Sequence, residues 1–418
     1  MGISLGLVGL GAFGRCFADL FKAHPLVDRI ALCDREPERM EAYAGKESWQ
    51  DKFNRRDMYG ALDEICRSDL DALVIITQPW LHAPQCLQAL KAGKHVYSAV
   101  PLISLPSADE ILDYCDQLVA TVKKTGRHYM LGETTYYRPE AMFCRRKAKE
   151  EAFGDFVYAE GEYFHDVDHK CSLREVQKSR LASSAGREWA KLAPRYAKRR
   201  ILSGPMHYPT HSTSGPVCVM NAHAEKVTAY GYRNRNRDPY FKASAFSNET
   251  ALFAMSNGAT VRICEFRECA GALAGQEETF RVMGTSGSYA EGVWRENFRT
   301  RPFTAKPLEV TKLTPEEMRD PLPGEVAEAF KRILQPNARP GDDFVPTGHG
   351  GSHPYLVHEF VDAVAHDRTP AINVWEAARY TAMGAAAHKS ALQGGRTLSV
   401  PDWGDAPGRN PARRAKRR

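Results

Sequence analysis

The chain has 418 residues, of which 43% are hydrophobic and 26% charged, and a formal net charge of +6. This length exceeds one ordinary core and predicts two domains. The composition is that of a globular protein and excludes a disordered or fibrous one. No apolar run reaches the roughly 18 residues that a membrane span needs, and Met1 leads almost directly into a strand, which leaves no room for a signal peptide. We therefore expect no membrane partner and a cytoplasmic location.

Most of the excess positive charge gathers in two segments. Residues 405–418 carry six Arg or Lys and one Asp, a net charge of +5. We expect a solvated basic tail there, and no nucleic-acid partner. The stretch 170–200 holds ten basic residues against two acidic ones. It predicts a partly helical basic insertion over residues 168–200, which either packs on a partner subunit or caps a site.

Ten cysteines lie scattered between Cys16 and Cys269 without a paired C-x-x-C spacing. They are typical of reduced core residues rather than of a disulfide framework or a zinc site. The histidines and carboxylates show no H-E-x-x-H or other ligand spacing, so we predict no metal. His353 and His358 stand five residues apart on a predicted helix and share no face. That spacing indicates surface or interface positions.

The chain opens with the pattern of a dinucleotide-binding unit. The apolar run Ile3–Val8 leads into Gly9-Leu10-Gly11-Ala12-Phe13-Gly14, and Arg15–Ala23 has helical spacing. In such a unit the first glycine permits the tight turn, the second lets the backbone approach a pyrophosphate, and the third lets the helix pack on the strand. The next predicted strand, Arg29–Cys33, ends at Asp34, where a carboxylate can accept hydrogen bonds from ribose hydroxyls. The spacing predicts a bound dinucleotide.

Two residues after this second strand bear on which dinucleotide binds. Asp34 would repel a 2′-phosphate, which favours NAD. Arg35, beside it, could accommodate NADP by turning toward that phosphate. We predict NAD as the cofactor, with NADP as the less favoured alternative.

Strands and helices continue to alternate up to residue 132. Strands are predicted at Ala72–Thr77, Lys94–Ser98 and Tyr129–Gly132, and helices at His82–Ala92 and Ser107–Lys124. This order is typical of an α/β Rossmann domain with a doubly wound parallel sheet, here residues 1–132. Ligands of such sheets lie at the carboxyl ends of the strands. The other candidate cofactor contacts stand there: Thr77, Pro79, Trp80, His82, Ser98, Val100, Pro101 and Glu133. Each could equally be loop geometry, and His82 a helix cap or a buried hydrogen-bonded residue.

Residues 133–404 have the pattern of a second, α+β domain. A strand is predicted at Phe156–Phe164, and apolar and polar residues alternate, as in the strands of one exposed sheet, in Val227–Tyr232, Thr250–Met255, Thr260–Phe266 and Thr279–Met283. The last predicted helices, Val357–Ala365 and Trp375–Leu392, return to the Rossmann side. Because a broad sheet face needs cover, we expect a homo-oligomer formed through this sheet.

Several runs resemble the Gfo/Idh/MocA family of NAD(P)-dependent oxidoreductases. They are GLVGLGAFG at the start, then DALVIITQPWLH, AGKHVYSAVP and FRVMGTSGS. The resemblance covers nearly the whole chain. It implies a Rossmann domain followed by a large, mainly antiparallel open sheet, which covers the nicotinamide and binds a small carbohydrate substrate.

The chain departs from this family at two places. Family oxidoreductases usually carry Glu-Lys-Pro where this chain has Ala99-Val100-Pro101, and that lysine helps to hold the substrate hydroxyl and move its proton. The family also tends to place an Asp four residues before a His, whereas here His207 precedes His211. Both changes resemble the NAD-dependent glycosidases typified by glycoside hydrolase family 109, which have Val-Pro and a Tyr-Pro-Thr-His motif. The runs 78–80, 159–166 and 348–351 agree with that branch.

The resemblance to this branch implies glycoside cleavage without net redox change. A sugar carbon, C3, is oxidised to a ketone, the acidified C2 proton is removed, the aglycone leaves C1, water adds, and the ketone is reduced again. Histidine and tyrosine suit the proton transfers in the absence of the lysine. The catalytic candidates are His211, Tyr208, His207 and His349, and the candidate substrate contacts are His165, Asp166 and Tyr137. Without the family, the 208–211 run is equally well explained as a turn into a helix, with Tyr208 packed and His211 capping.

Three functions therefore compete. The first is the redox-neutral glycosidase. The second is a conventional NAD(P)-dependent sugar dehydrogenase in which a histidine or tyrosine replaces the lysine. The third is a non-catalytic sensor of NAD or a sugar, which the retained ionisable residues at 207–211 and 348–351 make less favoured.

Overall fold

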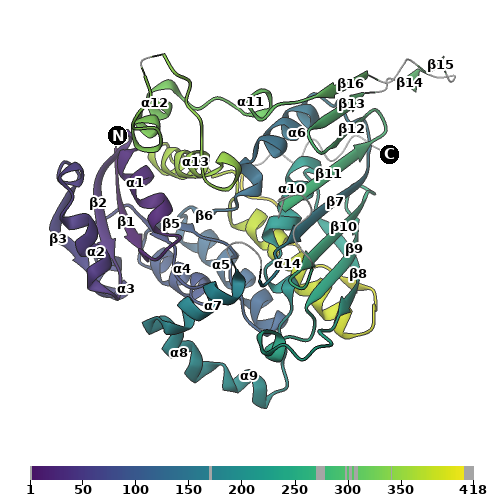
Figure 1. The fold of residues 1–418 in the computed structure, drawn as a ribbon, viewed down its shortest axis with the longest axis horizontal. Coiled ribbons are helices and arrows are strands. Elements are labelled where there is room, and N and C mark those ends of the chain that lie inside the picture. The colour runs from purple at the N-terminus through teal and green to yellow at the C-terminus, as the bar shows by residue number, and fades with distance from the viewer. Residues whose placement is uncertain are drawn as a thin grey trace.

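The structure is a computed structural model, which describes residues 2–168, 172–269, 278–296, 299–300, 304–305, 309–339 and 341–408. A parallel sheet with its helices lies at the N-terminal side and a larger sheet at the other side, with helices between them (Figure 1). The part of the basic tail from 409 to 418 falls outside the described residues. Within the described chain, no helix combines the length and the apolar character required to cross a membrane.

The first sheet has six strands in the order β3-β2-β1-β4-β5-β6, and each neighbouring pair is parallel. Its strands are β1 Ile3–Val8, β2 Val27–Cys33, β3 Phe53–Tyr59, β4 Ala72–Ile75, β5 His95–Ser98 and β6 Tyr129–Leu131. This is the predicted doubly wound Rossmann topology. Only β3 was not predicted, because it is an edge strand whose residues 54–56 are exposed and polar, so it has no apolar run.

Five helices accompany this sheet. They are α1 Arg15–Ala23, α2 Pro37–Ala44, α3 Leu62–Cys66, α4 His82–Lys91 and α5 Ala108–Thr125. The ends of α5 show why such helices form where they do. The Ser107 side chain accepts a hydrogen bond from the Glu110 backbone N–H, and Gly126 closes the helix in the left-handed conformation, with φ of 66°.

The second sheet has nine strands in the order β16-β13-β12-β11-β7-β10-β9-β8-β17. All neighbours are antiparallel except β7 and β10. The strands are β7 Phe156–Phe164, β8 Ala224–Tyr232, β9 Asn248–Met255, β10 Thr260–Phe266, β11 Glu278–Gly284, β12 Gly287–Ala290, β13 Val293–Glu296, β16 Glu309–Lys312 and β17 Leu398–Ser399; a short pair, β14 Arg299–Thr300 and β15 Thr304–Ala305, lies apart. The predicted fold class is therefore confirmed for both sheets.

Strand register places one row of polar residues across the inner face of this sheet. Glu249 on β9 pairs with Glu265 on β10, which pairs with Tyr163 on β7, which in turn pairs with Glu278 on β11. All four side chains belong to buried residues. Because directly opposite residues point to the same face, this row brings three carboxyl groups and a phenol to one side of the sheet.

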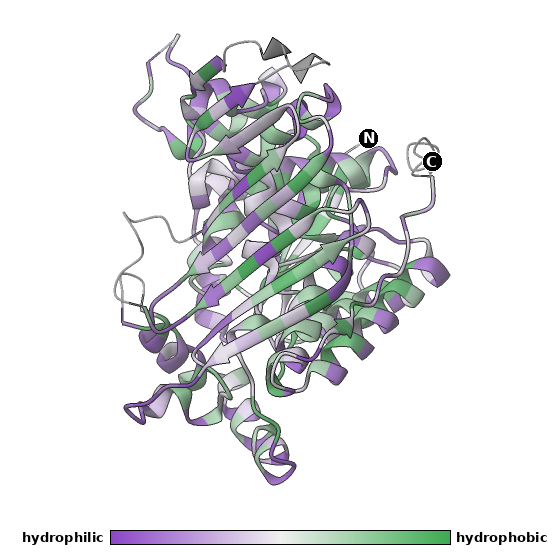
Figure 2. Ribbon diagram, turned by 90° about the vertical axis from the view of Figure 1, so that its right-hand side faces the viewer, coloured by the Kyte–Doolittle hydropathy of each residue, from purple (hydrophilic) through white to green (hydrophobic). Residues whose placement is uncertain are grey.

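The inner face is covered by helices, whereas the outer face is open. The C-terminal helices pack toward the Rossmann side, α13 against α1 and α14 against α5, as predicted. Helix α10 packs on β7 so closely that a Cβ at Gly161 would lie 1.8 Å from the Ser212 carbonyl oxygen. Figure 2 looks onto the outer face, where none of the described helices lies over the strands. The remaining helices are α6 Pro139–Lys149, α7 Leu173–Ala182, α8 Ser184–Leu192, α9 Pro194–Lys198, α10 Thr210–Met220, α11 Pro315–Met318, α12 Gly324–Leu334, α13 His353–Ala365 and α14 Val374–Leu392.

Candidate active site

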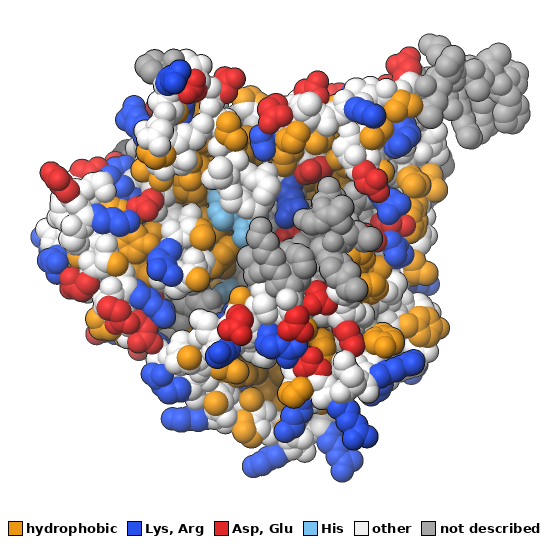
Figure 3. All heavy atoms as spheres, in the orientation of Figure 1, with side chains coloured by type: hydrophobic (Ala, Val, Ile, Leu, Met, Phe, Trp, Pro, Cys, Tyr) orange, Lys and Arg blue, Asp and Glu red, His pale blue; other side chains and the backbone are white. Residues whose placement is uncertain are grey.

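A cavity of about 1290 Å³ runs between the two sheets. Its wall extends from the glycine loop of β1 to Tyr163 on β7 and to residues of the insertion. Figure 3 shows this hollow, with histidine side chains in its depth. Its position at the carboxyl ends of the Rossmann strands is the one where such sheets bind ligands.

The glycine loop fits a dinucleotide. Gly9 has φ of 91°, and a Cβ there would lie 2.3 Å from the Ile76 carbonyl oxygen, so only glycine is accommodated. A Cβ at Gly14 would lie 2.1 Å from the Gly9 carbonyl oxygen, which keeps α1 close to the strand. At Gly11 a Cβ would instead point toward open cavity, with its nearest neighbour, an Arg39 nitrogen, 3.9 Å away. This is the space that a pyrophosphate needs beside the N-terminus of α1.

The adenosine end of the cavity carries charged residues that follow β2. The buried Asp34 carboxylate accepts hydrogen bonds from the backbone N–H groups of Leu10, at 2.7 Å, and Glu36, at 2.9 Å. Arg39 approaches the same carboxylate at 3.4 Å. Arg35 is turned to Glu188 on α8, with a separation of 2.7 Å. A carboxylate is thus fixed where ribose hydroxyls are expected, and the adjacent arginine is already paired.

The position of the missing lysine faces Tyr208. Val100 lines the cavity after β5, and no lysine is found among the described residues of the cavity wall. The Tyr208 hydroxyl donates a hydrogen bond to the Val100 carbonyl oxygen at 3.2 Å. Burial raises the pKa of Tyr208 above its ordinary value, so the hydroxyl stays protonated. A hydroxyl from the second domain therefore lies against the backbone at the place where the family places an ammonium group.

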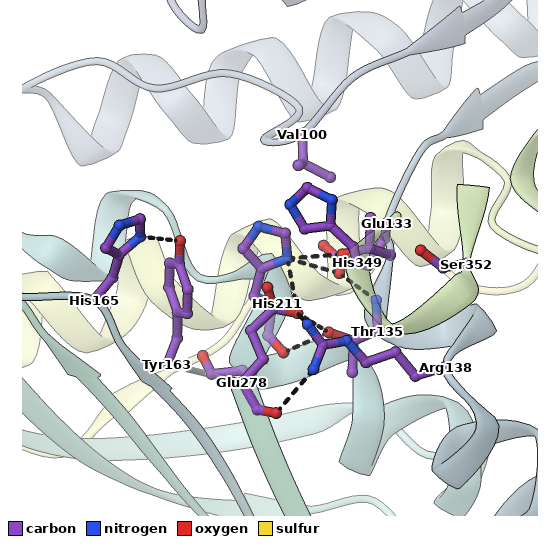
Figure 4. Close-up of polar contacts among 12 residues, drawn as sticks. Val100, Glu133, Thr135, Arg138, Tyr163, His165, His211, Glu278, His349 and Ser352 are labelled. Atoms are coloured by element: carbon purple, nitrogen blue, oxygen red, sulfur yellow. Dashed lines mark hydrogen bonds and ion pairs between the residues drawn. The ribbon is translucent and has the colours of Figure 1, made fainter. Parts of the chain in front are cut away.

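His211 lies at the start of α10, between two buried carboxylates (Figure 4). Its Nδ1 is 2.9 Å from Glu133 Oε1 and 3.8 Å from Glu278 Oε2. Glu133 also accepts the Thr135 backbone N–H at 2.9 Å, and Arg138 binds Glu278 at 2.8 Å. Since Nδ1 is engaged, Nε2 is the ring nitrogen left for the cavity that His211 lines. The helix begins at Thr210 without a side-chain cap, so His211 does not cap it.

These carboxylates change the charge of the imidazole. Burial opposes the charged form, but Glu133 and Glu278 outweigh it and raise the pKa of His211 to about 9. Burial alone would raise the pKa of Glu278, yet His211 and Arg138 lower it below its ordinary value. At neutral pH His211 is thus predominantly an imidazolium, and it becomes a strong base once it has lost its proton.

A second phenol and imidazole pair lies at the carboxyl end of β7. The Tyr163 hydroxyl and His165 Nδ1 are 2.6 Å apart, and both residues line the cavity. Tyr163 also meets the His211 ring edge-on, with centroids 4.9 Å apart. Behind it, Arg267 stacks over the Tyr163 ring at 4.6 Å and binds Glu265 at 2.7 Å. Burial raises the pKa of Tyr163 well above its ordinary value, so its hydroxyl stays protonated.

His349 lies above His211 on a glycine-flanked loop (Figure 4). It has φ of 42°, and Gly348, Gly350 and Gly351 also have positive φ, so the loop follows a path that few sequences can adopt. His349 Nδ1 is 2.9 Å from His353 Nε2, and burial lowers the pKa of His349. The surface or interface position predicted for His353 is wrong, because its ring is buried within the chain and packs on Phe17 at 4.3 Å. His353, at the start of α13, therefore supports the loop that carries His349.

His207 differs from the other candidate catalytic residues. It lines the cavity but is buried, and its ring packs edge-on against His388 at 4.3 Å. Burial and His388 hold the pKa of His207 well below its ordinary value, so the ring is neutral. The acid that the family places here is therefore not replaced by His207. Glu133 and Glu278, from distant parts of the sequence, supply carboxylates beside His211 instead.

The cavity gathers most of the predicted site residues but not all of them. Those in its wall are Gly9, Gly11, Phe13, Gly14, Asp34, Arg35, Thr77, Pro79, His82, Val100, His165, His207, Tyr208, His211 and His349. Those outside the wall are Trp80, Ser98, Pro101, Glu133, Tyr137 and Asp166. His82 is buried, with Nδ1 2.8 Å from the Pro101 carbonyl oxygen, which matches the hydrogen-bonded alternative.

The basic insertion forms one wall of the cavity. Its lining residues are Leu173, Glu175, Val176, Gln177, Ser179, Arg180, Ser183, Ser184 and Ala185. Residues 169–171 lie outside the described residues. Of the two roles predicted for the insertion, the structure supports the capping of a site.

Sequence reasoning missed Tyr163, Glu278 and Arg267. Tyr163 could have been found, because it stands two residues before His165, where extended chain continues past the end of β7, and so shares its face. Glu278 and Arg267 gave no such signal, since only strand pairing brings them to the site. In the described parts of the chain, no group of three or more His, Cys, Asp or Glu is arranged to hold a metal ion, and the nine described cysteines are free.

Known sequences similar to this chain include an NAD-binding family and glycosidases, which agrees with the dinucleotide loop and the histidine site described above. Residues 3–133 match the Gfo/Idh/MocA model, described as an oxidoreductase family with an NAD-binding Rossmann fold. A glycosyl hydrolase family 109 protein of Solibacter usitatus is 24% identical over 96% of this chain and 88% of its own length. An α-N-acetylgalactosaminidase of Bacteroides fragilis is 30% identical, but the match covers only 53% of this chain and 49% of that protein.

Solved structures share the fold at low identity. A levoglucosan dehydrogenase in complex with NADH and levoglucosan is 17% identical, with a TM-score of 0.67, over 96% of this chain and 100% of that one. A scyllo-inositol dehydrogenase of Lactobacillus casei, with bound NAD(H) and scyllo-inositol, is 16% identical, with a TM-score of 0.63, over 96% and 99%. These structures confirm the predicted fold, and the sequence matches above confirm the resemblance to the Gfo/Idh/MocA family that the motifs indicated.

Proposed function

We propose that this chain, an enzyme of the Gfo/Idh/MocA family, is an NAD-dependent glycosidase that cleaves a carbohydrate glycoside without net redox change. One observation carries the proposal. Where the lysine of a conventional dehydrogenase is expected, the cavity presents the Tyr208 hydroxyl against Val100, with His211 beside two buried carboxylates. The likeness to family 109 proteins over nearly the whole chain supports the same assignment.

Gly9, Gly11, Gly14 and Asp34 would hold the dinucleotide, since the loop leaves room for its pyrophosphate and Asp34 offers a carboxylate to its ribose. When bound, NAD supplies a hydride acceptor for the oxidation of one sugar carbon and a hydride donor for the later reduction. We propose NAD rather than NADP because Asp34 repels a 2′-phosphate and Arg35 is paired with Glu188.

His211 is the proposed base for the sugar hydroxyl. In its neutral form Nε2 accepts the hydroxyl proton as the carbon is oxidised, and the pKa of about 9 provides driving force for this transfer. The imidazolium that results is held by Glu133 and Glu278. It can then donate a hydrogen bond to the ketone oxygen and stabilise the enolate that forms when C2 loses its proton. The Tyr208 hydroxyl, which donates to the Val100 carbonyl in the structure, would turn to donate a hydrogen bond to the same oxygen when the sugar is bound.

Tyr163 and His165 are the proposed pair for the C2 proton. Their hydrogen bond of 2.6 Å allows one proton to be shared between the phenol and the ring. The pair lies in the same cavity wall as His211, which Tyr163 contacts directly. A group that removes the C2 proton can return one after water has added to C1, so the cycle regenerates the starting protonation state.

The decisive experiment follows glycoside cleavage and redox change together. Purified protein is incubated with aryl glycosides in deuterated water, with and without added NAD, and the released aglycone, the deuterium at C2 and the net NADH are measured. The proposal expects aglycone release, deuterium at C2 and no net NADH. Stoichiometric NADH without cleavage would contradict it and indicate a sugar dehydrogenase. Binding of NAD with neither reaction would indicate a sensor.

A homo-oligomer formed through the outer face of the nine-stranded sheet is also proposed. Tyr230 and Leu252 on this face are 65% and 50% exposed. Beside them, Glu160 binds Arg262 at 2.7 Å and Arg281 at 2.9 Å, a row of both charges that a second copy could complement. Light scattering on the purified chain and on Leu252→Lys tests this: the variant should be smaller than the parent, and equal masses would contradict the proposal.

A further inference from the structure

We propose that helix α8 of the insertion completes the adenosine end of the cavity, and that Glu188 on this helix makes the site select NAD over NADP. The inference rests on the proposed binding of NAD and deepens it. Part of the discrimination between NAD and NADP is thereby assigned to Glu188, a residue of the insertion. The glycine fingerprint and Asp34 give no sign of this contribution.

Two contacts fix α8 against the Rossmann domain. The Trp189 ring stacks on Trp80, with centroids 5.1 Å apart and an interplanar angle of 29°. At the start of the helix the Ser184 backbone N–H donates to Glu36 Oε1 at 3.3 Å. Trp80 is therefore used to hold the insertion rather than to line the cavity, while Ser184 itself is part of the cavity wall.

The geometry of α8 brings Glu188 to Arg35. The two side chains are 2.7 Å apart, and Arg35 directly follows Asp34 in the cavity wall. An arginine at this place is the group that accommodates the 2′-phosphate of NADP when it turns toward the ribose. In this chain that arginine already has a carboxylate partner. Binding a 2′-phosphate would require breaking the pair and placing the phosphate beside the Glu188 charge.

The other charged residues in this part of the cavity wall also disfavour a phosphate. Arg39 is the second arginine among the described residues that line this end of the cavity, and it lies 3.4 Å from the Asp34 carboxylate. Glu36 adds another carboxylate in the same wall. Both arginines in this part of the cavity wall are thus matched by an acid, so a ligand with two extra negative charges is disfavoured, whereas the uncharged ribose hydroxyls of NAD are not.

The pair contributes little to folding stability. The Arg35 and Glu188 side chains are 45% and 53% exposed, and ion pairs at such exposure are weak and screened by salt. A discriminating role is compatible with this exposure, because a charge next to a bound phosphate acts through repulsion rather than through its own pairing energy. The discrimination should accordingly be strongest at low ionic strength.

The test is calorimetric titration of NAD and of NADP into the purified full chain at low ionic strength, for the parent and for Glu188→Gln. We expect the variant to bind NADP about tenfold more tightly, with the dissociation constant for NAD changed less than about twofold. The double variant Arg35→Gln/Glu188→Gln also lacks the arginine that the loss of Glu188 would free for the phosphate, so most of the gain in NADP affinity should disappear. Lys389→Gln, which removes a comparable surface ion pair of 2.6 Å with Asp109, is the matched control and should leave both affinities unchanged.

The outcomes separate this inference from the proposed function. If both the parent and Glu188→Gln bind NAD, and the ratio of NADP affinity to NAD affinity is the same in the two proteins, the inference is overturned while the proposed NAD site stands. A parent chain that binds NADP as tightly as NAD overturns it as well. If the parent binds neither dinucleotide, the proposed function fails together with the inference.

Discussion

Two buried histidines of the second domain each lie against a glutamate, yet only one of them faces the cavity. His211 Nδ1 is 2.9 Å from Glu133, and His388 Nδ1 is 2.8 Å from Glu249. In both cases burial opposes protonation and the neighbouring glutamate outweighs it, so both pKa values are raised. The difference lies in the other nitrogen. His388 Nε2 is 3.2 Å from the Leu202 carbonyl oxygen, whereas His211 lines the cavity.

This difference shows that a buried imidazole and carboxylate pair does not by itself make an active site. Both ring nitrogens of His388 face acceptors, so the ring is an imidazolium that ties α14 to β9. His211 has a carboxylate on one side and the cavity on the other, and it can exchange a proton with a ligand. Access to the cavity decides the role of the histidine. Substitution of His211 should therefore mainly lower the reaction rate, whereas substitution of His388 should mainly lower folding stability.

The largest effect is expected at His211. His211→Gln should lower the rate of aglycone release by about 1000-fold, because the base for the sugar hydroxyl is lost. His366→Gln is the matched control, since His366 pairs with Asp362 at 3.0 Å on an exposed helix end. The control should keep the parent rate, and an equal rate in His211→Gln would remove this residue from the mechanism.

His388→Gln should instead destabilise the fold by at least about 3 kcal/mol, because it leaves Glu249 buried without its cation. Urea unfolding of the parent and both variants measures the difference. We expect a smaller loss for His211→Gln. Glu278 keeps its bond to Arg138, Glu133 keeps the Thr135 N–H, and water from the cavity that His211 lines can enter beside Glu133. Equal losses at the two positions would show that the two pairs do not differ as proposed.

Tyr208→Phe tests whether the hydroxyl at the lysine position matters to the reaction. Removing one hydrogen bond of roughly 1.4 kcal/mol from the reacting oxygen should lower kcat about tenfold, with a smaller change in KM. The ring packing is retained, so the free energy of unfolding in urea should fall only by about 1 kcal/mol, for the lost hydrogen bond to the Val100 carbonyl. A parent-like kcat would indicate that Tyr208 only packs against Val100.

The smallest effect is a displacement of the pH profile. The rate of the oxidation half-reaction should rise with pH up to about 9, because His211 must be neutral to accept the hydroxyl proton. Glu133→Gln removes the nearest carboxylate, so the pKa of His211 should fall and the plateau should begin at lower pH. The raised pKa of His211 also makes folding stability depend on pH. The protonated imidazole stabilises the fold below pH 6.5, and this contribution is lost as pH rises toward 9. An unmoved profile in Glu133→Gln would contradict the assignment.

Much of the first domain could be predicted because its signals are local. The glycine spacing from Gly9 to Gly14 and the acid at Asp34 lie within one βαβ unit, and the structure places them in one wall of the cavity. Tyr208 and His211, which follow each other into α10, were instead predicted from the resemblance to family 109, since local spacing alone allowed a turn into a helix equally well. Local spacing placed His353 wrongly at a surface or an interface, because a helical repeat shows which residues share a face but not what that face packs against.

The sequence by itself therefore determined the Rossmann topology, the dinucleotide loop, the absence of the expected lysine and the histidine motif. Only the tertiary structure decided what surrounds that motif. Glu249, Glu265, Tyr163 and Glu278 form one row because strand register aligns them, and Glu188 reaches Arg35 because the insertion folds back on the Rossmann domain. Register and docking depend on contacts between residues far apart in the chain, and spacing along one segment carries no information about them.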